Sequence, residues 1–187
     1  MGRARGGGQV TVDDWLQAGY AVLAAEGFRA LKIDNVCRRL GMTKGSFYHH
    51  FADVNAFHEA LVTSWAGWRD AEHRQMESLS SEEPRTRLRK MIDALVGPPL
   101  WTLERAMREW ARSDPRAEAS VRAADRQTRQ MIRQAFAEYG FDDETAARRA
   151  EWMFAMGIGA LHLSATPRSG PEWDAERDKL IEFLLRP

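Results

Sequence analysis

Apolar and polar positions along the chain follow the three-to-four-residue period of amphipathic helices from near residue 11 to near residue 185. Short breaks rich in Gly, Pro and polar residues interrupt this period. The pattern predicts an all-α fold of about nine helices. We expect them near residues 11–27, 33–40, 43–50, 53–77, 85–96, 100–112, 115–139, 142–163 and 172–185.

Residues 40–51 have the pattern of a sharp turn followed by a short helix. Gly41 follows a helical run, and glycine accepts the left-handed backbone that ends a helix abruptly. Thr43 then offers a hydroxyl group to cap the next helix. This arrangement is typical of a helix-turn-helix.

The short helix after this turn has two distinct faces. Phe47 and Phe51 are four residues apart, so they share one face and can pack on the preceding helix. Lys44, Tyr48 and His49 then lie on a different side. A helix with an apolar inner face and a polar outer face suits the major groove of DNA.

Residues 41–51, Gly-Met-Thr-Lys-Gly-Ser-Phe-Tyr-His-His-Phe, resemble the recognition segment of the TetR-family transcriptional repressors. Upstream, Ala24-Ala25-Glu26-Gly27-Phe28 looks like the end of the family's first helix. Downstream, the long helix that begins near Asp53 fits the helix that joins the family's two domains. The resemblance covers roughly the first third of the chain, and the remainder is similar only in being helical.

This resemblance implies a bacterial, cytoplasmic and nucleoid-associated regulator. Such a regulator, most often a repressor, binds a palindromic double-stranded DNA operator as a homodimer and is released by a small-molecule effector. The implied architecture is a three-helix DNA-binding domain over residues 10–53 and a helical ligand-binding and dimerisation domain over residues 54–187. The Arg- and Gly-rich residues 1–9 are expected to be a disordered arm, which either reaches along DNA or is only a flexible terminus.

By the same resemblance we assign DNA contacts to the recognition segment. Lys44 should reach a base edge or the adjoining phosphate, and Gly45 should let the helix approach the DNA backbone closely. The sequence departs from the family at Asp34 and Val54, where a basic residue is common. The expected DNA-binding residues are Lys32 (where the family often has threonine), Thr43, Lys44, Gly45, Ser46, Tyr48, His49 and His50.

Large aromatic and sulfur-containing side chains are frequent in the second domain, and two interpretations stay open. They line a cavity for an apolar or aromatic effector, or they fill an ordinary core. In the second case the protein is a DNA-binding architectural dimer without an effector. The expected lining residues are Trp65, Trp68, Trp101, Met107, Trp110, Met131, Trp152 and Met156.

Residues 152–163 are apolar nearly all round, so this helix must be buried on several sides. A helix that buries one face in its own domain and another in a partner has this pattern. The resemblance to the TetR family implies that the last two helices form this homodimer interface. Its expected residues are Trp152, Ile158, Leu161, His162, Leu180 and Leu184.

The amino-acid composition and charge of the chain limit the kinds of function that it can have. The formal net charge is zero, but residues 1–53 carry seven basic and five acidic residues. The excess of positive charge in this segment has the sign that suits DNA binding.

The single cysteine, Cys37, excludes an internal disulfide and is expected to be a small buried residue. We find no metal-ligand cluster, phosphate loop or nucleophile arrangement, so we expect no metal, no cofactor and no enzymatic activity. No apolar run is long enough to span a membrane.

Overall fold

The computed structural model describes residues 10–97, 101–164 and 166–186, and within these ranges the chain is all-α, as the periodicity predicts. One turn of 3-10 helix, η1 (Phe28–Ala30), was not expected. The expected arm at residues 1–9 and the break at Pro98-Pro99 lie outside the described residues. The helices are α1 (Val12–Glu26), α2 (Ile33–Leu40), α3 (Lys44–His50), α4 (Val54–Glu77), α5 (Pro84–Val96), α6 (Trp101–Ala111), α7 (Pro115–Tyr139), α8 (Asp143–Leu163) and α9 (Pro171–Leu184).

Side-chain caps visible in the sequence fix several helix starts. Thr11 and Asp14 form a reciprocal capping box at the start of α1. Three aspartates accept hydrogen bonds from first-turn backbone amides of α4, α7 and α8, which satisfies groups that a helix itself leaves unpaired. These aspartates are Asp53, Asp114 and Asp142.

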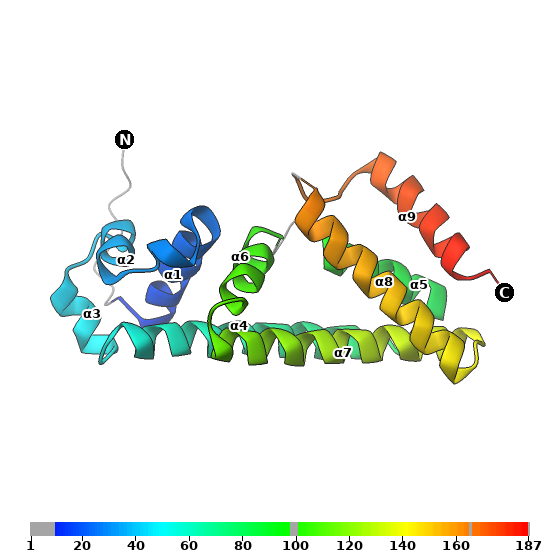
Figure 1. Ribbon diagram of the computed structural model, residues 1–187, viewed down its shortest axis with the longest axis horizontal. Coiled ribbons are helices and arrows are strands. Elements are labelled where there is room, and N and C mark those ends of the chain that lie inside the picture. The colour runs from blue at the N-terminus through cyan, green and yellow to red at the C-terminus, as the bar shows by residue number, and fades with distance from the viewer. Residues whose placement is uncertain (1–9, 98–100, 165, 187) are drawn as a thin grey trace.

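Two long helices, α4 and α7, pack side by side along most of the molecule (Figure 1). Helices α1, α2 and α3 gather at the N-terminal end of α4, and α5, α8 and α9 lie toward the opposite end. Helix α6 contacts both α1 and α7. The long helix α4 therefore connects the two ends of the molecule physically.

The first hydrophobic core joins α1–α4 to α6 and to the start of α7. Its largest fully buried side chains are Trp15, Phe47, Phe57, Trp65 and Trp110. The hydroxyl of Tyr20 on α1 donates a hydrogen bond to the carbonyl of Leu61 on α4, at 2.7 Å. The expected domain boundary at residue 53 thus falls inside one shared core, which couples α4 to the N-terminal helices.

The second hydrophobic core lies among α5, α8, α9 and the C-terminal half of α7. Leu88, Ile132, Phe136 and Ile181 are completely buried there. Cys37 is buried instead in the first core, as expected, and burial raises the pKa of its thiol. Within the described ranges, no helix is long and apolar enough to cross a membrane, and no cluster of metal-binding side chains occurs.

Candidate nucleic-acid interface and interior cavities

The turn between α2 and α3 has the geometry that its residues predict. Gly41 ends α2 with φ 74° and ψ 29°, a left-handed conformation that favours glycine. Thr43 caps α3, and its hydroxyl oxygen accepts a hydrogen bond from the backbone amide of Ser46 at 3.2 Å. The two helices are therefore joined by a short, well-defined turn.

Two phenylalanines hold α3 on the first core. Phe47 is completely buried, with its ring perpendicular to that of Trp15 at a centroid distance of 5.5 Å and close to Phe57 at 5.4 Å. Phe51 is also buried and packs against both Phe47 and Phe57. These contacts fix which side of α3 faces outward.

The outward side of α3 carries most of the residues expected at DNA. Thr43, Lys44, Gly45 and His49 are exposed, and Tyr48 is 55% exposed. Ser46 and His50 are half-buried, and the His50 ring lies against Trp15. Lys32 is exposed at the N-cap of α2, where its side chain makes no capping hydrogen bond.

An acidic residue lies within this basic surface. The ammonium group of Lys44 is 2.6 Å from a carboxylate oxygen of Asp34 on α2, and both side chains are mostly exposed. The hydrogen bond from Lys44 to Asp34 raises the pKa of Lys44 by favouring its charged form. No local pattern in the sequence predicts this pair, because the two residues lie on different helices.

Glycine at position 45 is not required by the packing of the protein itself. A Cβ atom placed there would meet only the hydroxyl oxygen of Thr43, at an ordinary contact distance of 3.7 Å. The backbone of Gly45 also lies outside the left-handed region. If a small residue is required at this position, the reason must be a molecule that approaches α3 from outside.

The aromatic residues expected to line an effector cavity do not share one cavity. Trp65, Met107 and Trp110 are buried inside the first core, and Trp68 packs on Tyr20. Trp101 borders an open cleft between α1, α6 and α8 that also includes His162. Trp152 and Met156 are exposed on α8, and Met131 borders a narrow cavity between α4, α5 and α7.

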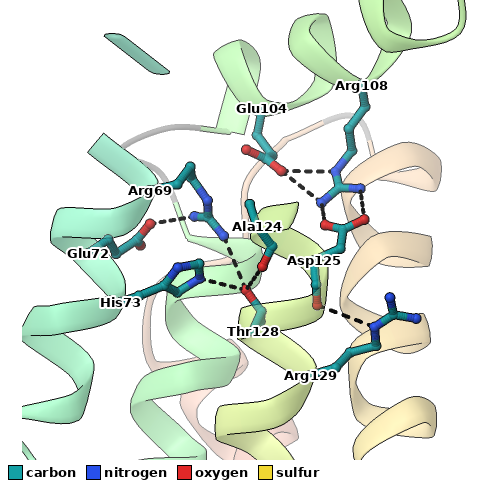
Figure 2. Close-up of polar contacts among 9 residues, drawn as sticks. All are labelled: Arg69, Glu72, His73, Glu104, Arg108, Ala124, Asp125, Thr128 and Arg129. Carbon is teal, nitrogen blue, oxygen red and sulfur yellow. Dashed lines mark hydrogen bonds and ion pairs between the residues drawn. The ribbon is translucent and has the colours of Figure 1, made fainter. Parts of the chain in front are cut away.

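Polar side chains at this narrow cavity were not expected from the sequence. Arg69 and His73 on α4 converge on the hydroxyl of Thr128 on α7, with His73 Nε2 2.9 Å from Thr128 Oγ1 (Figure 2). All three residues are buried, with at most 9% of their surface exposed. A signal did exist, because Arg69 and His73 continue the four-residue spacing of the buried Leu61 and Trp65.

The expected dimer residues divide into inward and outward groups. Leu161 and Leu184 are only 1% exposed within the single chain, so they pack inside it and support α8 and α9 from within. Ile158 and Leu180 are half-buried and His162 is exposed. The large apolar side chains exposed on these two helices are Trp152, Met156, Leu163 and Phe183.

Residues 16–61 match the family described as bacterial regulatory proteins, tetR family. Proteins of this family are DNA-binding regulators and not enzymes, so the match assigns the helix-turn-helix to a regulator. A comparison with curated proteins finds no match.

Solved structures share the fold at low sequence identity. A protein of Mesorhizobium loti assigned to the tetR family is 18% identical, with a TM-score of 0.70 over 93% of this chain and 94% of that one. The ketosteroid regulator KstR2 of Mycobacterium tuberculosis is 17% identical, with a TM-score of 0.66 over 98% and 97%. FadR of Bacillus subtilis, solved with stearoyl-CoA, is 14% identical, with a TM-score of 0.67 over 94% and 98%.

Proposed function

This chain is a transcriptional regulator whose N-terminal domain belongs to the tetR family, and we propose that it is a ligand-responsive repressor that binds a palindromic operator as a homodimer. The observation that carries the proposal is α3, which is anchored by Phe47 and presents Lys44 and Tyr48 to solvent. Exposed basic and hydroxyl groups on such a helix suit contacts with base edges and phosphates. The protein would act at the nucleoid in the bacterial cytoplasm.

The homodimer is proposed from the outer faces of α8 and α9. Trp152, Met156 and Leu163 lie on one side of α8, and their exposure is unusual for such large apolar side chains. Phe183 adds a further exposed ring on α9, at 60% exposure. Pairing of this surface between two copies would bury these groups and place two copies of α3 against two operator half-sites.

Release by a small effector is proposed from the cavity beside Thr128. Most of its polar lining, Arg69, Glu72 and His73, is on α4, the helix that directly follows α3. KstR2 is a ketosteroid regulator, and FadR was solved in complex with stearoyl-CoA. By analogy of fold, these two proteins support a small-molecule effector here. The filled interior of the first core favours the alternative, an architectural dimer without an effector.

The test is selection of binding sites from random DNA duplexes by the full-length protein, followed by binding titrations over a salt series. We expect a palindromic site and an affinity that falls steeply with salt. The double variant Lys44→Ala with Tyr48→Phe should lose most of this affinity while keeping the wild-type melting temperature. Wild-type affinity and salt dependence in the double variant would show that α3 does not contact DNA.

A further inference from the structure

The described residues line a narrow cavity between α4, α5 and α7, with a volume of about 30 Å³, room for about one water molecule. Its apolar walls are Met76, Met91, Leu95 and Met131. Met76 also borders an open cleft of about 660 Å³ between α4, α5 and the start of α9. Because methionine side chains adapt their shape easily, movement of Met76 would join the two spaces.

The cavity offers no uncompensated charge. Arg69 forms an ion pair with Glu72, and burial together with the Arg69 charge lowers the pKa of His73, which is therefore neutral at neutral pH. The neighbouring Arg108 contacts both Glu104 and Asp125, at 2.9 and 2.6 Å (Figure 2). A charged ligand group would enter this interior without an opposite charge of its own, which is strongly unfavourable.

The charged side chains of the open cleft are paired in the same way. Arg177 lies 2.7 Å from Asp93 and 2.9 Å from Asp174. Lys90 pairs with Glu82, at 2.7 Å. The route to the cavity therefore has no net charge that would select an anion or a cation.

Two buried polar atoms beside the cavity have no hydrogen-bond partner. The Thr128 hydroxyl donates to the carbonyl of Ala124 at 3.0 Å, so its oxygen accepts from His73 Nε2. The proton of the neutral His73 ring is then on Nε2, and Nδ1 is left as an unpaired acceptor. Gln127 approaches the ring but lies outside hydrogen-bonding geometry with Nδ1. The Nε–H group of Arg69 is an unpaired donor.

From this geometry we propose that the effector is an uncharged, mainly apolar molecule with one hydroxyl group, which it places beside Arg69 and His73. A hydroxyl can accept from Arg69 and donate to His73, whereas a purely apolar molecule leaves both atoms unpaired. The methionine side chains would contact the apolar body. This inference rests on the proposed function, because it assumes that the cavity is the effector site.

The placement of these residues also indicates how binding would reach the DNA-binding surface. Arg69 and His73 belong to α4, which begins at Val54, directly after α3. At about 1.5 Å per residue, Arg69 is about 20 Å from the start of α4. A ligand that separates α4 from α7 would therefore shift the end of α4 that holds α3, and operator affinity would fall.

The experiment compares four probes with the same bicyclic body on the wild-type full-length protein: 2-naphthol, naphthalene, 2-naphthoate and 2-naphthylmethylammonium. Calorimetric titration and melting temperature are measured at neutral pH without DNA. We expect 2-naphthol to bind about tenfold more tightly than either charged probe and about fivefold more tightly than naphthalene, the latter being the scale of one hydrogen bond. Only 2-naphthol should raise the melting temperature clearly.

Two variants at the cavity and one control variant locate the site. His73→Phe keeps a ring but removes the acceptor, and it should weaken 2-naphthol binding about fivefold while leaving naphthalene binding unchanged. The matched pair Thr128→Val and Thr63→Val removes one hydroxyl in the cavity and one on the exposed face of α4. Only Thr128→Val should weaken 2-naphthol binding. Without the Thr128 hydroxyl, the proton of the His73 ring is no longer held on Nε2, so Nδ1 is no longer fixed as an acceptor.

Three results would overturn the inference: equal or tighter binding of a charged probe, no binding of any probe, or 2-naphthol binding that His73→Phe and Thr128→Val leave unchanged. These readouts need no operator. A protein that binds 2-naphthol as expected but no DNA would instead contradict the proposed function alone.

Discussion

The ammonium group of Lys44 lies 2.6 Å from the carboxylate of Asp34, so an acidic residue of α2 pairs with a cation on α3. Asp34 also adds negative charge to a surface proposed to face phosphates. We expect Asp34→Asn to raise affinity for DNA of any sequence and to steepen the salt dependence by about one unit per protomer. Titrations over a salt series measure both quantities.

The melting temperature of Asp34→Asn should remain close to wild type, because exposed ion pairs contribute little to folding stability. Asp13→Asn, at an exposed acidic position on α1, is the matched control for the loss of one negative charge. If the two variants change DNA binding equally, the position of Asp34 beside Lys44 has no special effect.

Gly45→Ala should raise the stability of the protein and lower its affinity for DNA. The new methyl group fits the protein, and alanine within a helix is more stable than glycine by about 0.5–1 kcal/mol. Operator affinity should nevertheless fall, because the methyl group would hold α3 away from the DNA backbone. Denaturant unfolding and binding titrations check the two effects. Unchanged operator affinity would mean that DNA does not approach α3 at this point.

Substitutions at two neighbouring residues of α3 should have different effects, one on folding stability and the other on DNA binding. Phe47→Ala removes a completely buried ring and should lower the free energy of unfolding by about 3–5 kcal/mol. Tyr48→Phe changes an exposed side chain and should leave unfolding unchanged while weakening DNA binding by about 1 kcal/mol per half-site. The assignment of the two faces is wrong if Tyr48→Phe destabilises the fold as Phe47→Ala does.

Substitutions on the two sides of α8 should also have different effects, one on dimerisation and the other on folding stability. Trp152→Glu places a charge on the exposed face and should convert the dimer to a folded monomer, as measured by light scattering and circular dichroism. Leu161→Ala instead removes a buried side chain and should lower the free energy of unfolding by about 2–5 kcal/mol without changing the mass of the folded protein. A wild-type protein that is monomeric at micromolar concentration would contradict the proposed dimer.

His58 should make stability depend on pH. Its Nε2–H group donates to the carbonyl of Leu31 at 3.0 Å, and the ring packs against Phe28 and Trp110. Burial is the largest effect and lowers the pKa of His58 below 6.5. The hydrogen bond to the Leu31 carbonyl opposes this shift, and the charge of Arg116 adds to it. The unfolded chain thus binds a proton first as pH falls.

The contribution of His58 to stability is therefore complete above pH 6.5 and is lost as the pH falls below that value toward the lower folded-state pKa. His58→Gln should reduce the fall in melting temperature over this range. Comparison of both proteins at alkaline pH, where the ring is neutral, isolates the cost of the substitution itself. Parallel curves for the two proteins would show that His58 does not contribute to the acid sensitivity.

The sequence alone was sufficient to predict the helices and the helix-turn-helix. Thr11 with Asp14, Asp53, Asp114 and Asp142 each act within three residues of a helix start, so their effect can be read locally. Gly41 and the four-residue spacing of Phe47 and Phe51 likewise fix the turn and the buried side of α3. Such signals need no knowledge of distant segments.

Only the tertiary structure decided which side chains share an environment. Asp34 meets Lys44, and Arg69 and His73 meet Thr128, because separate helices bring them together. Periodicity showed that α8 is apolar all round, but it could not show that Leu161 faces inward while Trp152 faces solvent. A helix repeats every 3.6 residues whatever surrounds it, so the identity of its neighbours depends on how the helices pack.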